Sequence, residues 1–271
     1  MTRPAYPTDL TDAQWVCLVD LVPDQQSIGR PLKYARREVF NALLYITHTG
    51  CQWRALPHDF PPWPTVRYYF DRWTADGTLE RLHTALREQV RRKAGRDPQP
   101  SAGVLDSQSV KMGHQPGVRG YDGGKQVTGR KRHLLVDTLG LLLVVLVTAA
   151  NVSDSAGARL LLDPAVGPFT RLRRVWADSG YQGSLVEWVA GCWEWVLEIV
   201  RHVVPVHRFV LLPKRWIVER TFGWWGHARR LSKDYEVAPA NSVSWIYLTM
   251  THLMLHRLAP PPKQSKKKKP I

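Results

Sequence analysis

The stretch RHLLVDTLGLLLVVLVTA, residues 132 to 149, contains two apolar runs on either side of Leu139 and Gly140. Each run has the length and the apolar content of a buried β-strand, and the glycine between them is typical of a tight turn. The pattern predicts a β-hairpin, and therefore a sheet, in the middle of the chain.

Further strands are predicted on both sides of this hairpin, at GVLDSQSV (103–110), RLRRVWAD (171–178) and WEWVLEIVRH (193–202). Helical spacing fits residues 154–163 and 182–191, and a third helix is predicted to begin at Arg215. The order is three strands, helix, strand, helix, strand, helix. This order predicts an α/β fold of the ribonuclease-H-like type, whose central mixed sheet carries helices on both faces.

The first hundred residues predict a small all-helical domain. LTDAQWVCLVDLV opens with a capping box formed by Thr11 and Gln14, and a second helix is predicted to stop at Gly50. Two further basic helices are expected up to about Lys93, which favours a helix-turn-helix-like DNA reader, although the segment 50–64 is longer than a tight turn. We therefore expect a helical DNA-binding domain in 1–95, a linker in 96–102 and a catalytic domain with a C-terminal helix in 103–258.

The composition favours a polyanionic partner. The chain has 38 Lys and Arg against 23 Asp and Glu, a net charge of +15 over 271 residues, which suits nucleic acid or an anionic membrane surface. No apolar run reaches the roughly 20 residues of a spanning helix, and the N-terminus lacks the layout of a signal peptide. We therefore expect a cytoplasmic, nucleoid-associated protein with no membrane partner, ending in a disordered basic tail at 259–271.

The stretch RWIVERTFGWWGHARRLSKDYE, residues 215 to 236, places one carboxylate, Glu219, among many cations. At about 100° per residue, Glu219, Gly223, Gly226 and Arg230 would share one line of a helix. An ordinary amphipathic helix with a solvated charged face explains this spacing. Two glycines beside the acid, each costing about 1 kcal/mol in a helix, instead suggest clearance for a backbone, a metal or a phosphate.

Two more acids stand in strands that the predicted topology makes neighbours. Asp106 lies in the strand VLDSQSV, and Asp178 closes the strand in VWADSGYQG. If the later helix brings Glu219 to the same place, the three carboxylates repel one another unless a cation is bound. Oxygen ligands of this kind favour two Mg²⁺ ions, with Mn²⁺ as a substitute, and in-line phosphoryl transfer. Asp137 and Asp154 have structural explanations, as a residue before a turn and a helix cap.

Several segments resemble the DDE insertion-sequence transposases, closest to the group called insertion sequence five within the insertion-sequence-four-like superfamily. VLDSQSV, ADSGYQG and LPKRWIVERTFGWWGHARRLSKDYE look like the three acidic motifs of these enzymes, and the N-terminal LTDAQW, GRPLKYARREVFNALLYI and GCQWRALPHDFPPWPTV also look like that group. The resemblance runs from about residue 8 to residue 256. In the third motif, Arg215 and Glu219 match the expected spacing. Leu212 stands where the third motif of the superfamily has a tyrosine, and Gly226 stands where it ends with a lysine or an arginine.

The resemblance implies that Asp106, Asp178 and Glu219 bind divalent metal and catalyse the reaction. It also implies cleavage of double-stranded DNA at terminal inverted repeats and transfer of the 3′-hydroxyl ends into target DNA. Because two ends must be held together, a homodimer is the simplest arrangement. A flipped-base or hairpin mechanism that relies on the missing tyrosine and lysine is not implied. Two alternatives stay open, namely a related nuclease without joining activity and a catalytically inactive DNA-binding protein derived from a transposase.

Basic residues near the acids are candidate DNA contacts. A solvated basic face is the alternative for each of them. The candidates are Arg215, Arg220, Arg229, Arg230 and Lys233 around the third acid, and Arg119, Lys125, Arg130 and Lys131 in the segment GVRGYDGGKQVTGRKRH.

Overall fold

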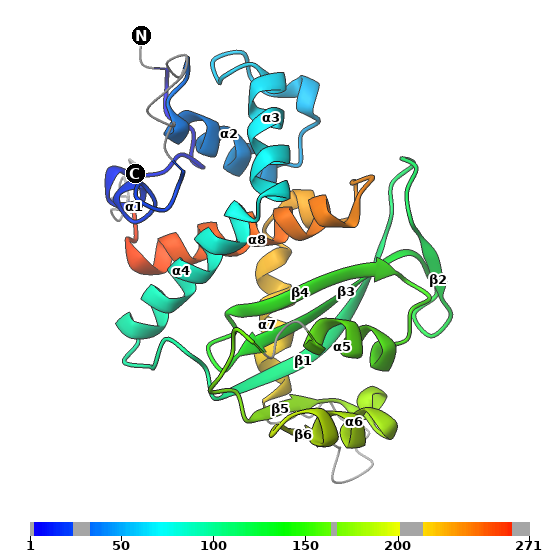
Figure 1. Cartoon of the computed structure of the whole chain (residues 1–271). Coiled ribbons are helices and arrows are strands. Elements are labelled where there is room, and N and C mark those ends of the chain that lie inside the picture. The colour runs from blue at the N-terminus through cyan, green and yellow to red at the C-terminus, as the bar shows by residue number, and fades with distance from the viewer. Residues whose placement is uncertain (1–2, 24–32, 164–166, 201–213, 262–271) are drawn as a thin grey trace, which may run out of the picture.

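The computed structural model describes residues 3–23, 33–163, 167–200 and 214–261 (Figure 1). As the sequence predicts, helices come first and a sheet follows. Thr11 and Gln14 form the expected capping box, and Gly50, with a φ of 71°, ends the second helix in the left-handed conformation. The N-terminal elements are α1 (Asp12–Val16), α2 (Arg36–Thr49), the 3₁₀ turn η1 (Trp53–Ala55), α3 (Trp63–Ala75) and α4 (Thr78–Lys93).

The six strands of the described chain form one mixed sheet. They are β1 (Ala102–Lys111), β2 (Gly120–Asp122), β3 (Val127–Asp137), β4 (Leu142–Ala149), β5 (Arg174–Ala177) and β6 (Val196–Ile199). Strands β2, β1 and β4 all pair antiparallel with β3, while β5 pairs parallel with β1 and β6 parallel with β5. The predicted hairpin is β3–β4. The short strand β2 lies in the segment GVRGYDGGKQVTGRKRH, at residues where no strand was predicted.

Helices cover both faces of this sheet (Figure 1). On one face, Val104 of β1 and Leu134 of β3 share a hydrophobic core with Ile217 of α7 (Arg215–Trp225). On the other face, the neighbouring residues Leu105 and Leu135 join a second core with α5 (Asp154–Leu162) and α6 (Ser184–Cys192). Successive residues of a strand point to opposite faces, so Asp106 lies on the α7 side. The ribonuclease-H-like arrangement expected from the element order is confirmed.

The predicted helix in 215–236 is shorter than its spacing suggested. Helix α7 ends at Trp225 with Gly226 as its C-cap, and the chain turns into η4 (Arg229–Leu231). Arg230 therefore does not continue the line of Glu219 and Gly223. The apolar residue Leu231 is still buried, but it reaches the core from η4 instead of from a helix.

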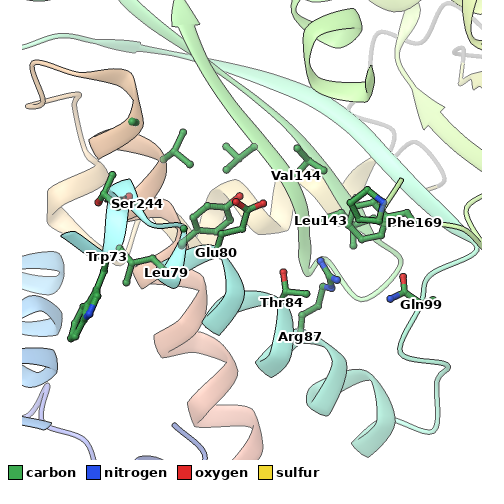
Figure 2. A pocket seen from close by; sticks show the side chains of 17 residues that line it. Trp73, Leu79, Glu80, Thr84, Arg87, Gln99, Leu143, Val144, Phe169 and Ser244 are labelled. Atoms are coloured by element: carbon green, nitrogen blue, oxygen red, sulfur yellow. Dashed lines mark hydrogen bonds between the residues drawn. The ribbon is translucent and has the colours of Figure 1, made fainter. Parts of the chain in front are cut away.

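The last helix joins the two halves of the chain. Helix α8 (Pro239–Leu258) packs against α4, α2 and strand β4, and a single core extends from Leu10 to Leu255. Between α4, α8 and β4 lies a cavity of about 430 Å³, into which the buried guanidinium of Arg87 projects over the ring of Phe169 (Figure 2). The predicted domain boundaries therefore stay a prediction. In the described ranges no helix has the length and apolarity to cross a membrane.

Candidate active site

Asp106 lies in the middle of β1, opposite Leu134 of β3. Strand β1 is long because it pairs over nine residues with β3, so its backbone is held on that side. The parallel partner β5 reaches β1 only as far as Val104. Asp106 therefore emerges just beyond the point where β5 ends, and its side chain remains 15% exposed.

Asp178 follows β5 directly, as the sequence predicts. It is the N-cap of a short 3₁₀ turn, η3 (Ser179–Tyr181), and its Oδ1 accepts a hydrogen bond of 2.8 Å from the backbone N–H of Gly180. Its other oxygen, Oδ2, does not take part in that bond and faces Arg215 of α7. Because β1 and β5 are parallel neighbours, the two aspartates lie beside each other at the carboxyl end of β5.

Glu219 comes to the same place from α7, and Arg215 marks the point where the three acids meet. Arg215 lies one helical turn before Glu219. Its Nη2 atom is 3.9 Å from Asp106 Oδ2, 3.5 Å from Asp178 Oδ2 and 3.9 Å from Glu219 Oε1. Three carboxylates far apart in the sequence thus surround one cationic nitrogen. If the charged residues of α7 only formed a solvated face, Asp106 and Asp178 would have no reason to lie beside Glu219.

The electrostatics follow from this crowding. Burial raises the pKa of Asp106 to about 6, and the negative charge of Asp178 adds to the rise. Asp106 accepts a hydrogen bond of 2.7 Å from the backbone N–H of Ser107. This bond and the positive charges of Arg215 and Lys125 lower the pKa of Asp106 again. A carboxylate held in its charged form at neutral pH by nearby cations can exchange those cations for a metal ion.

Two residues of the site carried no clear signal in the sequence. Tyr181 is 1% exposed beneath the carboxylates, and burial together with the charge of Asp106 raises the pKa of its phenol well above the usual range. Lys214 is the N-cap of α7 with a φ of 71°, and its Nζ lies 3.8 Å from the centre of the Trp176 ring. A lysine in the left-handed region is uncommon.

Asp154 is not the cap of α5. Ser153 is the N-cap, because its side chain accepts a hydrogen bond from the N–H of Ala156. Asp154 instead accepts from Ser107 Oγ at 2.7 Å and pairs with Lys131 at 3.1 Å. Asp137 is explained as expected, since it accepts bonds from the turn residues after β3 and pairs with a buried arginine of α4.

Three predicted DNA contacts are structural instead. Arg130 is 0% exposed and pairs with Asp234 at 3.0 Å. Arg230 is 8% exposed, and its Nε donates to Glu236 at 3.0 Å. Lys131 is 5% exposed between the carboxylates of Asp122 in β2 and Asp154 in α5. The prediction that these residues contact DNA is corrected, because their charged groups are buried and already neutralised by carboxylates.

The other predicted contacts keep accessible side chains, in three different places. Arg215 and Lys125 lie at the carboxylates, where Lys125 Nζ donates to the carbonyl of Ser107. Arg220 is half-buried between the rings of Trp216 and Trp224 and donates to a carbonyl at the β3–β4 turn. The three exposed residues away from the carboxylates are Arg119 before β2, and Arg229 and Lys233 beyond the end of α7.

The donor set suits a hard divalent cation. Asp106, Asp178 and Glu219 supply only oxygen atoms, as Mg²⁺ and Mn²⁺ prefer, and they already surround one positive charge. Within the described residues, no three metal-ligating side chains are grouped closely enough to hold an ion as they stand. Arg215 lies between them, so an ion could be shared by all three only if this side chain swung away.

Comparisons with known proteins agree with this geometry. Residues 97–254 match the family described as transposase DDE domain, and residues 10–83 match the family described as putative transposase of the IS4/5 family. A putative transposase for insertion sequence element IS402 from Burkholderia cepacia is 32% identical over 115 residues, 40% of this chain and 54% of that protein. The chain thus spans about half the length of this curated relative. No solved structure matches.

The first of these matches covers more than half of the chain and includes β1, β5 and α7, which carry the three acids. The second covers α1 to α3 and the beginning of α4. The chain therefore belongs to the DDE-domain transposases, with an N-terminal region of the IS4/5 type.

Proposed function

We propose that this protein is the DNA transposase of an insertion sequence, which cuts DNA at the terminal inverted repeats and transfers the 3′-hydroxyl ends into target DNA. The observation that supports this most is the meeting of Asp106, Asp178 and Glu219 around one cationic nitrogen. Membership of the DDE family supports the same reaction class. The relative from Burkholderia cepacia bears the same kind of name, a putative transposase for an insertion sequence element.

The acids are proposed to hold two Mg²⁺ ions, or Mn²⁺ in their place. Such ions would activate a water or a 3′-hydroxyl and stabilise the leaving oxygen of a phosphodiester. Asp106 and Asp178, from adjacent parallel strands, form the rigid part of the site. Glu219 is 48% exposed on α7 and is the acid with the most freedom to adjust.

DNA is proposed to approach the face where Arg215 and Lys125 meet the acids. When the carboxylates bind metal, Arg215 loses its counter-ions and becomes available for a phosphate. Gly223, one turn beyond Glu219, has open space at its Cβ position, which leaves room for a phosphate backbone beside the acid. The remaining contacts proposed for the same double-stranded DNA are Arg119, Arg220, Arg229 and Lys233. A homodimer is the simplest arrangement that holds two ends together.

The function is tested with a supercoiled plasmid that carries a marker between the element's own ends. Purified protein with Mg²⁺ should release the marker segment and join it to a second plasmid, and the products are read on gels and by sequencing the junctions. Cut ends without joined products would favour the nuclease. DNA binding without any cut product would favour the inactive DNA-binding protein.

A further inference from the structure

The helical region contains one helix whose surface is mostly free of other protein. Of the 13 residues of α3, only Val66, Phe70 and Trp73 are buried. They lie at positions i, i+4 and i+7, which form one narrow stripe. Tyr69 is half-buried against the same core, the opposite side of the helix is exposed, and α3 stands beside α2 at the end of the molecule opposite β5 and β6 (Figure 1).

The other helices of this region are covered. Eight of the 14 residues of α2 are buried, because α2 lies at the centre of the helical core. Eight of the 16 residues of α4 and 11 of the 20 of α8 are buried, because these two helices pack against each other. Helix α1 has only five residues. A helix that enters a DNA groove must present a long free face, and α3 has the smallest buried fraction among α2, α3, α4 and α8.

The side chains on this face suit DNA. Tyr68 is 57% exposed and Arg72 is exposed, and at i and i+4 they point to the same side, opposite the buried stripe. Arg72 has no acid or hydrogen-bond partner among the described residues, whereas the exposed Arg92 of α4 pairs with Glu88. Arg54 of η1, just before the helix, lies over the Trp63 ring, whereas Arg67 of α3 lies over the Trp53 ring and is paired with Asp71 at 2.7 Å.

We propose that α3 is the element that reads the terminal inverted repeat, by entering the major groove of double-stranded DNA with Tyr68 and Arg72 towards the bases. This inference rests on the proposed function. A helix of 13 residues is about 20 Å long, and the major groove, about 12 Å wide, admits one helix. Arg72 can bind a guanine edge through two donors, and Tyr68 can contact a thymine methyl or an acceptor beside it. Arg54, which is exposed in η1 just before α3, is then available for a neighbouring phosphate.

The test compares binding to two duplexes, one with the element's terminal sequence and one with the same bases scrambled. Fluorescence anisotropy at several salt concentrations gives the affinity ratio between the duplexes and the salt slope for each variant. Arg72→Ala should lower the ratio about tenfold or more, and Tyr68→Ala should lower it as well. Arg92→Ala is the matched control, because it removes the same charge from an exposed helix position and should leave the ratio unchanged.

Replacing guanine by 7-deazaguanine in the terminal duplex removes an acceptor in the major groove without changing the phosphates. Wild-type protein should lose affinity at one or more guanines, and Arg72→Ala should be insensitive at one of them. If Tyr68→Ala and Arg72→Ala both keep the wild-type ratio, the inference is wrong while the proposed function stands. If the wild type does not distinguish the two duplexes, the proposed function fails, and the inference fails with it.

Discussion

Arg230→Ala separates a structural arginine from a DNA-binding one. The Arg230 guanidinium donates to Glu236 through Nε at 3.0 Å and again through Nη2, and its Nη1 is 3.3 Å from the carbonyl oxygen of Cys51. Trp245 Nε1 donates to the same Glu236 oxygen at 2.9 Å. Both members of the pair are almost fully buried, so the pair links η4 to the helical core.

Removing the arginine leaves the Glu236 charge buried with only one neutral donor to its Oε1. Breaking a buried ion pair from one side costs about 3–5 kcal/mol of unfolding free energy. For a chain of this size, such a loss lowers the melting temperature by on the order of 10 °C. A phosphate contact would behave differently, because its loss reduces the slope of log affinity against log salt by about one. We expect the melting temperature to fall and the salt slope to stay unchanged.

The assay is thermal unfolding together with binding of terminal DNA at four or more salt concentrations. Lys233→Ala is the matched control, since Lys233 is exposed three residues further along; it should melt like the wild type and reduce the slope by about one. The double variant Arg230→Met with Glu236→Leu should recover much of the stability, because it removes both charges. An Arg230→Ala protein that melts like the wild type and loses one unit of salt slope would refute this reasoning.

Three further predictions follow from single contacts of the site. Burial raises the pKa of Asp106 to about 6, so its contribution to stability is present below pH 4 and is lost as the pH rises through 6. At pH 8, Asp106→Asn should therefore have a free energy of unfolding up to about 3 kcal/mol higher than that of the metal-free wild type. An equal or lower stability of the variant would contradict this. Gly140 has a φ of 77° and its Cβ position lies 2.9 Å from the Trp224 ring, so Gly140→Ala should cost more than about 1 kcal/mol in chemical denaturation, whereas Gly223→Ala in α7, with open space around it, should stabilise by about 0.5–1 kcal/mol. Arg215→Gln removes a cation beside the acids, so the pKa of Asp106, followed by carbon NMR, should rise further; an unchanged pKa would show that the two groups do not interact.

Much of the fold was predictable because it follows from local periodicity. The hairpin around Gly140, the stop at Gly50 and the capping box at Thr11 each have a short-range physical cause, and the structure confirms all three. The strand order predicts that β1 and β5 are neighbours, and the two strands pair in parallel. The positions of Asp106 and Asp178 beside each other follow from that pairing.

What failed depended on packing that helical or strand spacing does not specify. Arg130 was predicted to be a surface cation because its partner Asp234 lies 104 residues further along the chain. Arg230 was predicted to be one because Glu236, six residues away, reaches it only through the turn that follows η4. The end of α7 at Trp225 was missed because Ala228 and Leu231 keep a helical spacing although they lie outside the helix. The same limit hid Arg215, whose role as counter-ion to three acids depends on residues more than a hundred positions away in the case of Asp106.

The central claim, that Asp106, Asp178 and Glu219 act together on DNA through divalent metal, is tested most directly by their amide variants. Cleavage of a plasmid carrying the element's ends is measured with Mg²⁺ and with Mn²⁺, and binding of terminal DNA is measured in parallel. Asp106→Asn, Asp178→Asn and Glu219→Gln should each lower cleavage by about 10³-fold or more while the affinity for terminal DNA stays near that of the wild type. Near-normal cleavage by any one of the three would contradict the account at that position.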